Sequence, residues 1–304
     1  MKLTILGCYS ATPQVNTNPT AQILDVKNHT FLIDCGEGTQ VELRRNKVKF
    51  NRIKHIFISH LHGDHCFGLA GLLSTFNLLT READLHIYGP KGLKALITLQ
   101  LKLSNSWTSY KLVFHELTST TSELIFQDDK VEVYTIPLDH RIYTNGFLFK
   151  EKLGERKLDM NAVLNADIDV AYYRKLKQGG DVPNNSGELV KNSSVTKAPK
   201  PSKSYAFCSD TAYSESIIPI IQDVTVLYHE STFLEKNKDL ARSTKHSTAK
   251  QAATIAKKAS VGQLILGHYS TRYSSINMFK VEAETIFSNL ELATDGKVFE
   301  FSSL

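Results

Sequence analysis

The first half of the chain alternates short apolar runs with polar segments rich in turn-forming residues. Residues 30–34 and 53–59 are expected to form strands, and the second is apolar on both faces, as in a strand covered on both sides. Apolar residues at helical spacing predict a helix over 67–79, and residues 92–101 have a similar pattern. Residues 131–136 alternate between apolar and polar, which predicts a half-exposed strand.

The second half repeats this alternation after a long polar interval. Strands are expected at residues 205–208, 224–228, 263–266 and 298–301, and helices at 247–258 and 279–290. Strands interleaved with helices in both halves indicate an α/β fold built in layers.

The interval from residue 150 to residue 203 lacks a sustained pattern. A short helix is expected over 168–176, whereas residues 183–203 are polar and rich in turn-forming residues, which favours a flexible segment. We therefore expect a single domain over residues 1–304 with an inserted arm at 150–203.

The chain of 304 residues has a formal net charge of +5, and most of this excess lies in the arm. Residues 150–203 hold eleven basic and seven acidic side chains, a net +4. This excess is equally consistent with a phosphate-binding arm and with a solvated loop.

The composition argues against a membrane-spanning protein and against a protein built around disulfides or thiolate zinc sites. No apolar run approaches the roughly 18 residues that a membrane helix needs, so no membrane span is expected. The four cysteines are scattered without a C-x-x-C pair, so neither a disulfide framework nor a thiolate zinc site is indicated. A reducing, cytoplasmic location is therefore expected.

The strongest local signal is the segment His60-Leu61-His62-Gly63-Asp64-His65, directly after the apolar strand. Three imidazoles and a carboxylate within six residues are costly to pack unless they bind something. In an extended loop, His60 and His62 would point to one side, and Asp64 and His65 to the other. Such a loop can serve two adjacent metal ions, and mixed imidazole and carboxylate ligands are typical of catalytic zinc sites. The alternative, a surface histidine cluster without function, fits poorly between an apolar strand and an apolar helix.

Three further candidate ligands are His140, Asp210 and His268, each shortly after a predicted strand. A single polar residue at such a position is usually only hydrogen-bonded. Because all the candidates fall at strand ends, where an α/β sandwich opens its active-site cleft, their repetition favours a function.

This set of residues resembles the ligand pattern of the metallo-β-lactamase fold, a four-layered αβ/βα sandwich. The resemblance implies that His60, His62 and His140 hold one zinc ion, that Asp64, His65 and His268 hold a second, and that Asp210 bridges the two. Two zinc ions per subunit are the implied cofactors.

Within that fold, the sequence is similar to the tRNase Z family of tRNA 3′-processing enzymes. The similarity lies in the order of several short motifs. These are Leu6-Gly7 through Thr12-Pro13, Asn18-Pro19-Thr20, Asp34-Cys35-Gly36-Glu37-Gly38-Thr39-Gln40, Phe207-Cys208-Ser209-Asp210-Thr211, His229-Glu230-Ser231-Thr232-Phe233 and His246-Ser247-Thr248.

The resemblance implies a zinc-dependent endoribonuclease that removes the 3′ trailer from precursor tRNA after the discriminator base, leaving a 3′-hydroxyl on the tRNA. In this interpretation His246, held by Glu230, protonates the leaving ribose oxygen, and Asp64 helps to orient the attacking hydroxide. The alternative for His246 is an N-cap or phosphate-anchoring residue at the head of the following helix.

The resemblance also gives the arm a role. Family members carry a protruding segment between the third histidine ligand and the bridging aspartate, and it grips tRNA away from the cleavage site. Here Arg174, Lys175 and Lys177 are candidates for RNA contact. The family's Gly-Pro turn is absent, since the comparable stretch reads Asn165-Ala166-Asp167-Ile168-Asp169. The enzyme would be a homodimer in which one subunit's arm presents tRNA to the other's metals.

Two other functions remain open. A hydrolase of the same fold acting on a small phosphodiester or thioester would not need a basic arm. A non-catalytic, metal-bearing RNA-binding protein would not need the pair of Glu230 and His246. Six remaining residues are expected to be packing, surface or structural residues: His29, His55, Cys66, His86, His115 and His229.

Overall fold

The computed structural model describes residues 1–12 and 14–301, so Pro13 of the N-terminal motif lies outside the described residues. Tertiary contacts divide the chain into two compact units. The larger unit comprises Met1–Lys150 and the described chain from Lys203 onward, and the smaller comprises Glu151–Ser202.

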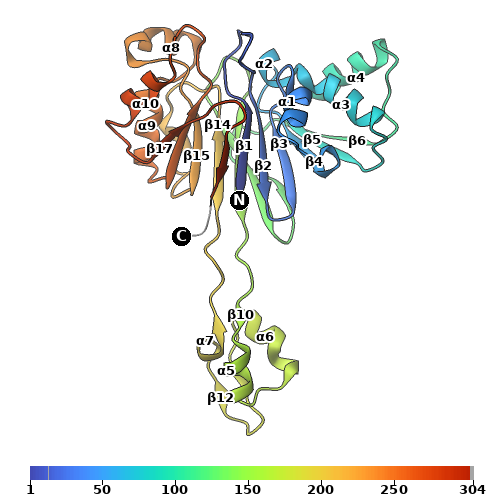
Figure 1. The fold of residues 1–304 in the computed structure, drawn as a ribbon, viewed down its shortest axis with the longest axis vertical. Coiled ribbons are helices and arrows are strands. Elements are labelled where there is room, and N and C mark those ends of the chain that lie inside the picture. The colour runs from blue at the N-terminus through green and yellow to red at the C-terminus, as the bar shows by residue number, and fades with distance from the viewer. Residues whose placement is uncertain (13, 302–304) are drawn as a thin grey trace. The chain divides into compact units, whose positions relative to one another are not determined.

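Within the described residues, the larger unit contains two seven-stranded sheets (Figure 1). The first has the order β18 (Val298–Glu300), β1 (Lys2–Gly7), β2 (Ala21–Val26), β3 (His29–Ile33), β4 (Ile53–Phe57), β5 (Leu85–Pro90) and β6 (Leu112–Leu117). The second has the order β17 (Leu290–Leu292), β16 (Gln263–Gly267), β15 (Val226–Glu230), β14 (Ser204–Cys208), β9 (Asn145–Glu151), β8 (Val131–Pro137) and β7 (Leu124–Gln127).

Helices cover the outer face of each sheet (Figure 1). The first sheet carries α1 (Thr39–Arg45), α2 (Gly63–Cys66), α3 (Gly68–Leu78) and α4 (Leu93–Leu103). The second carries α8 (Lys238–Thr244), α9 (Ala249–Lys258) and α10 (Asn277–Ala283). Among the described residues, no helix combines the length and apolar character needed to cross a membrane.

The inner faces of the two sheets pack against each other through aromatic rings. Phe31 of β3 and Phe57 of β4 each lie 5.3 Å, centroid to centroid, from Phe149 of β9. The neighbouring residue of β4, Ile56, belongs instead to the apolar cluster that includes Leu72 of α3. β4 is therefore covered on both sides, as its sequence predicts, and the layers run helix, sheet, sheet, helix.

The strand directions bring distant residues to one edge of the sandwich. β3, β4 and β5 pair in parallel, and so do β14, β15 and β16. The residues that follow the carboxyl ends of parallel strands lie at the same edge, where α/β folds place their binding sites.

The C-terminal region differs from its prediction. The expected helix over 279–290 is α10, which ends at Ala283, and Leu290 begins β17. Leu290 pairs with Leu264 in a parallel ladder, so this apolar residue extends the sheet instead of the helix. A helix and a short buried strand present similar apolar residues, and only the available partner strand decides between them.

The smaller unit contains short regular elements between residues 157 and 197. Its elements are β10 (Lys157–Leu158), α5 (Met160–Asn165), η2 (Val170–Tyr172), α6 (Tyr173–Lys177), β11 (Val182–Pro183), β12 (Leu189–Val190), α7 (Asn192–Val195) and β13 (Thr196–Lys197). A small apolar cluster joins Val163, Leu176, Val182 and Val195. Residues 183–203, expected to be flexible, thus contain short regular elements, because isolated apolar residues such as Val195 find partners earlier in the unit.

Candidate metal centre

The predicted ligands lie together at the edge where the parallel strands end. His60 and His62 follow β4, while Asp64 and His65 lie within α2 rather than in an extended loop. The other candidates follow β8, β14 and β16. Asp210 and His268 have φ angles of 62° and 58°, in the left-handed region that is unfavourable for most residues other than glycine. Such strained backbone is concentrated at functional sites.

One group of side chains surrounds His62. Its Nδ1 atom lies 2.9 Å from Nε2 of His60 and 3.3 Å from Nε2 of His140. Oδ2 of Asp210 lies 3.5 Å from Nε2 of His60 and 3.6 Å from Nε2 of His140. Four potential ligand atoms from three segments of the chain therefore converge on one point.

A second group lies on the other side of Asp210. Oδ1 of Asp210 lies 3.1 Å from Nε2 of both His65 and His268. Oδ2 of Asp64 lies 3.4 Å from Nε2 of His65 and 3.6 Å from Nε2 of His268. The two oxygens of Asp210 thus face two different groups, an arrangement suited to a carboxylate that is shared by two cations.

In His65, His140 and His268, a neighbour holds the ring nitrogen that points away from the centre. Nδ1 of His65 lies 2.7 Å from Oδ2 of Asp34, which is fully buried. Nδ1 of His268 lies 2.8 Å from the Thr232 hydroxyl, and Nδ1 of His140 lies 2.9 Å from the Lys245 carbonyl. Such contacts fix the ring orientation of metal-ligating histidines.

Sequence reasoning gave Asp34 no role, although its motif contributed to the family resemblance. The Ser59 backbone N–H and hydroxyl both donate to its carboxylate, at 2.7 and 2.8 Å. Its φ angle of 55° turns the chain at the end of β3, beside the parallel strand β4. A carboxylate ending a strand adjacent to a histidine-rich loop is the signal that could have identified it.

The electrostatics of His60, His62 and Asp210 match metal ligation, whereas the carboxylates of Asp210 and Asp64 outweigh burial and raise the pKa of His65 well above its ordinary value. Burial, together with the neighbouring imidazole of His65, lowers the pKa of His60 well below its ordinary value. Burial and His140 likewise lower the pKa of His62. Burial would raise the pKa of Asp210, but the surrounding imidazoles of His268 and His65 hold it well below its usual range. Neutral imidazoles and an ionised carboxylate are the forms that bind divalent cations.

A buried carboxylate, Glu230, organises the groups beside the centre. It ends β15, is fully buried, and its Oε1 lies 2.8 Å from Nδ1 of His246. It also accepts backbone N–H bonds from Thr211 at 2.8 Å and Ser247 at 3.1 Å. Burial lowers the pKa of His246, but the charge of Glu230 outweighs this effect and raises it to about 9.

The N-cap interpretation of His246 does not hold. The N-cap of α9 is Thr248, whose side chain accepts from the Gln251 backbone while the Gln251 side chain accepts from the Thr248 backbone. Since the helix start is satisfied without it, the His246 ring is free to face the cleft.

The centre opens into a cleft of about 390 Å³. Its lining includes His62, Asp64, Asp210, His246 and His268, together with Arg141 and Phe233. A cationic Arg141 beside the candidate ligands suits an anionic substrate such as a phosphodiester.

The predicted RNA-contacting residues lie in the smaller unit. Arg174, Lys175 and Lys177 are exposed on α6, and Leu176 between them is buried in the apolar cluster of that unit. α6 is thus oriented with its apolar residue inward and its cations toward solvent.

Four histidines outside the centre are brought together by β3 to β6. The rings of His55 and His86 stack at 5.1 Å, and Nδ1 of His86 lies 3.0 Å from Nε2 of His115. His29 contacts Asp128 at 2.7 Å. These partners lie on neighbouring strands or, for Asp128, directly after β7 of the second sheet, and all are distant in the sequence, which is why the sequence showed none.

The chain is similar in sequence and in structure to several known proteins. Residues 1–167 match the family model described as Anti-Pycsar protein Apyc1. A protein of Parabacteroides distasonis named Ribonuclease Z is 44% identical over 294 residues, covering 97% of each chain. Human tRNase Z, short form, has a similar structure, with a TM-score of 0.73 and 28% identity over 99% of each chain. The metallo-β-lactamase fold protein YhfI from Bacillus subtilis matches with a TM-score of 0.69 and 19% identity over 98% of each chain. The predicted fold is confirmed.

Proposed function

The chain belongs to the ribonuclease Z family, and on this premise we propose that it is a tRNA 3′-processing endonuclease that cuts precursor tRNA after the discriminator base. The products would be a tRNA with a 3′-hydroxyl and a trailer with a 5′-phosphate. The observation that carries this proposal is one cleft lined by residues of both ligand groups and by His246, whose Nδ1 atom contacts the buried carboxylate of Glu230.

We assign two zinc ions to the centre. One would be held by His60, His62 and His140, the other by Asp64, His65 and His268, with Asp210 between them. The fit is supported by the donor set, which contains imidazole and carboxylate without thiolate, and by the neighbours that orient His65, His140 and His268. When bound, two zinc ions supply activation of water and charge neutralisation for the phosphate undergoing in-line displacement.

His246 is the proton donor in this proposal. Water attacks phosphorus and releases one proton to the solvent, the bond from phosphorus to O3′ of the tRNA breaks, and a proton from His246 passes to that oxygen. Glu230 is a positioning residue, because its contact with Nδ1 leaves Nε2 of His246 to face the substrate. The carboxylate of Asp64 lines the same cleft and serves to orient the attacking water.

The arm supplies substrate binding. Arg174, Lys175 and Lys177 present three exposed cations on one short helix, a spacing suited to successive RNA phosphates. We propose a homodimer in which the arm of one subunit holds tRNA for the metal centre of the other. The four cysteines, all free and buried, are consistent with a cytoplasmic location.

The dimer arrangement can be tested by complementation. One subunit would carry His60→Ala and an intact arm, and the other Arg174→Ala, Lys175→Ala and Lys177→Ala with an intact centre. Each variant alone should cleave precursor tRNA poorly, and the mixture should regain activity in heterodimers. A mixture no more active than its components would contradict binding across the dimer.

The cleavage itself is tested by incubating the protein with a 3′-extended precursor tRNA and mapping the new 3′ end. A cut after the discriminator base, abolished by a chelator and restored by zinc, is expected. Absence of cleavage by folded, zinc-loaded protein would overturn the proposal.

A small phosphodiester is the alternative substrate. Through residues 1–167 the chain also belongs to the family described as Anti-Pycsar protein Apyc1. That match ends before Asp210, Glu230, His246 and His268, so it does not cover the groups proposed to act on the leaving oxygen. Hydrolysis of a small phosphodiester without cleavage of precursor tRNA would favour this alternative.

A further inference from the structure

A second strongly basic surface lies outside both the metal centre and the arm. Between residues 44 and 54 the chain carries six basic side chains and no acidic one: Arg44, Arg45, Lys47, Lys49, Arg52 and Lys54. All six are exposed. Arg45 pairs with Glu42, but within the described chain no carboxylate forms an ion pair with Arg44, Lys47 or Lys49. These cations come from the end of α1, the following loop, the short helix η1 (Phe50–Arg52) and the start of β4.

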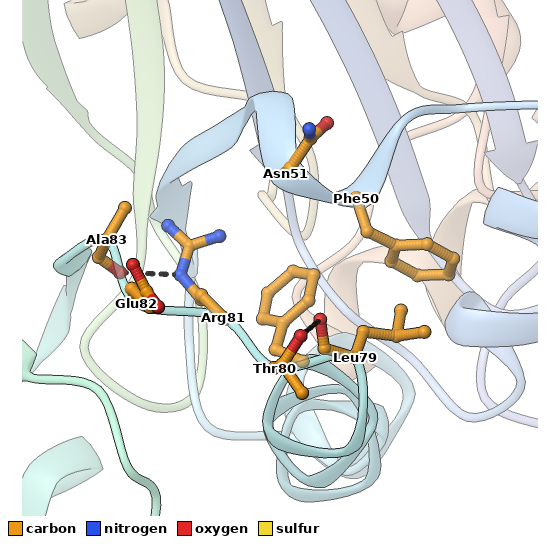
Figure 2. Close-up of a pocket in the computed structure, with 8 residues that line it drawn as sticks. Phe50, Asn51, Leu79, Thr80, Arg81, Glu82 and Ala83 are labelled. Carbon is orange, nitrogen blue, oxygen red and sulfur yellow. Dashed lines mark hydrogen bonds between the residues drawn. The ribbon is translucent and has the colours of Figure 1, made fainter.

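This surface is hollowed on both sides of Phe50. One hollow is lined by Arg44, Lys47 and Lys49 together with Phe50, and it has no acidic side chain. The other, of about 290 Å³, is lined by Phe50 and residues 79–83. Figure 2 shows the Phe50 ring and Leu79 on one side of this second hollow and the Arg81 guanidinium on the other. We call residues 44–51 and 79–83 together the basic groove.

Two cations of the basic groove flank a pair of aromatic rings. The Arg44 guanidinium lies 5.2 Å from the centroid of the Phe50 ring, which lies 5.8 Å from that of Phe76. The Arg81 guanidinium lies 5.1 Å from the Phe76 ring. The partly exposed Phe50 ring and the Arg44 guanidinium therefore offer an aromatic face and a cation side by side, the two kinds of group that bind single-stranded nucleic acid.

Arg81 adds a buried cation to the second hollow. Arg81 is only 8% exposed, and its Nε and Nη2 donate to the main-chain carbonyls of Ala83 and Asp84 at 2.8 and 3.0 Å. These acceptors fix the loop but carry no net charge. Burial accordingly lowers the pKa of Arg81. The second hollow therefore combines a guanidinium, the Glu82 carboxylate and the Asn51 amide, which are groups able to bond to the polar edge of a base.

We infer that the basic groove binds single-stranded RNA, with successive phosphates on the Arg44, Lys47 and Lys49 side and a base in the hollow beside Phe50 and Arg81. The distribution of charge supports this polarity, since the first hollow is purely cationic and the second contains one cation and one anion. No residue of the basic groove lines the cleft of the metal centre. The inference goes beyond the proposed function, from which it takes only RNA as the class of ligand.

The test uses a ten-nucleotide single-stranded RNA that carries a 5′ fluorophore and a photoreactive 4-thiouridine. The protein is full-length and zinc-loaded and carries His246→Ala. This substitution slows cleavage of the RNA and leaves the basic groove intact. We expect crosslinks to peptides containing Phe50 or residues 79–83. In fluorescence anisotropy, Arg44→Ala with Lys47→Ala and Lys49→Ala should make the slope of log affinity against log salt about 2 units shallower, at roughly 0.7 per phosphate contact.

Phe50→Leu keeps apolar volume while removing the ring. It should weaken RNA binding at least fivefold, about the lower limit for loss of one base contact with an aromatic ring. A matched control, Lys94→Ala with Lys102→Ala and Lys257→Ala, removes the same charge from exposed positions elsewhere. Thermal unfolding of every variant verifies that the fold persists.

Several outcomes would overturn the inference. These are crosslinks confined to the metal centre or the arm, equal slopes for the two triple variants, or a duplex RNA that binds as tightly as the single strand. If precursor tRNA is not cleaved but RNA crosslinks to Phe50, the proposed function is wrong. The inference that the basic groove binds RNA is then still supported.

Discussion

Oε1 of Glu230 lies 2.8 Å from Nδ1 of His246, at the point where β15 ends and the chain approaches α9. The same carboxylate accepts backbone N–H bonds from Thr211 and Ser247. It therefore connects the segment that carries Asp210 with the segment that carries His246. Removing it would disturb both the orientation of the proposed proton donor and the loop of a candidate ligand.

Replacing His246 should slow cleavage most for substrates whose leaving group needs a proton. His246→Ala is expected to lower kcat for precursor tRNA by about 10²- to 10⁴-fold, the usual contribution of a general acid. A nitrophenyl phosphodiester, whose leaving group needs no proton, should lose much less activity. Steady-state kinetics with both substrates measures this difference, and an equal loss on both would contradict the role of proton donor.

Asp34 is expected to control metal affinity without touching the metal. Asp34→Ala removes the partner of Nδ1 of His65, so zinc affinity should fall about 10- to 100-fold. Zinc binding is measured by competition with a chromophoric chelator. Asp25→Asn, which changes a carboxylate on β2 that bonds to Thr30, is the matched control and should leave zinc affinity unchanged.

Removal of metal should destabilise the larger unit. Without cations, the carboxylates of Asp64 and Asp210 and five imidazoles remain packed together at the end of the sandwich. A ligand present at 100 to 1,000 times its Kd adds about 3 to 4 kcal/mol to the free energy of unfolding. Calorimetry should therefore show a lower Tm after chelation and recovery with zinc. An unchanged Tm would argue against bound metal.

Acid should weaken the fold partly through His55. Burial, with the nearby imidazoles of His86, His29 and His115, lowers the pKa of His55 to about 3. Between pH 6.5 and 3 the unfolded chain binds a proton that the folded chain does not, so stability falls as the pH falls through this window. His55 alone should contribute about 2 kcal/mol of loss between pH 6.5 and 5. Denaturant unfolding of the protein and of His55→Phe at both pH values measures this, and the variant should lose less stability.

The arm should determine the salt dependence of tRNA binding. Arg174→Ala with Lys175→Ala and Lys177→Ala should make the slope of log affinity against log salt shallower by 2 to 3 units, at about 0.9 per duplex phosphate. Hydrolysis of a small phosphodiester should be unaffected, because these cations lie in a separate unit. Filter binding over a range of salt concentrations gives the slope, and a parallel line for the variant would exclude α6 from RNA contact.

The sequence by itself determined the layered α/β fold and the position of the ligand-rich segment. The periodicity of β4 and α3 reflects local backbone geometry, and the cost of packing His60, Asp64 and His65 together is also local. Both could therefore be inferred from neighbouring residues. The repetition of ligand types after strands made His140, Asp210 and His268 candidates, because parallel strands end at the same edge.

Only the tertiary structure decided which side chains meet across the sheets. It placed one oxygen of Asp210 toward each ligand group, and Asp34 behind His65. It also joined Phe50 and Arg81 in one groove and folded residues 189–197 against Val163. These contacts join residues distant in sequence, and their geometry depends on strand register and burial, which no local pattern encodes.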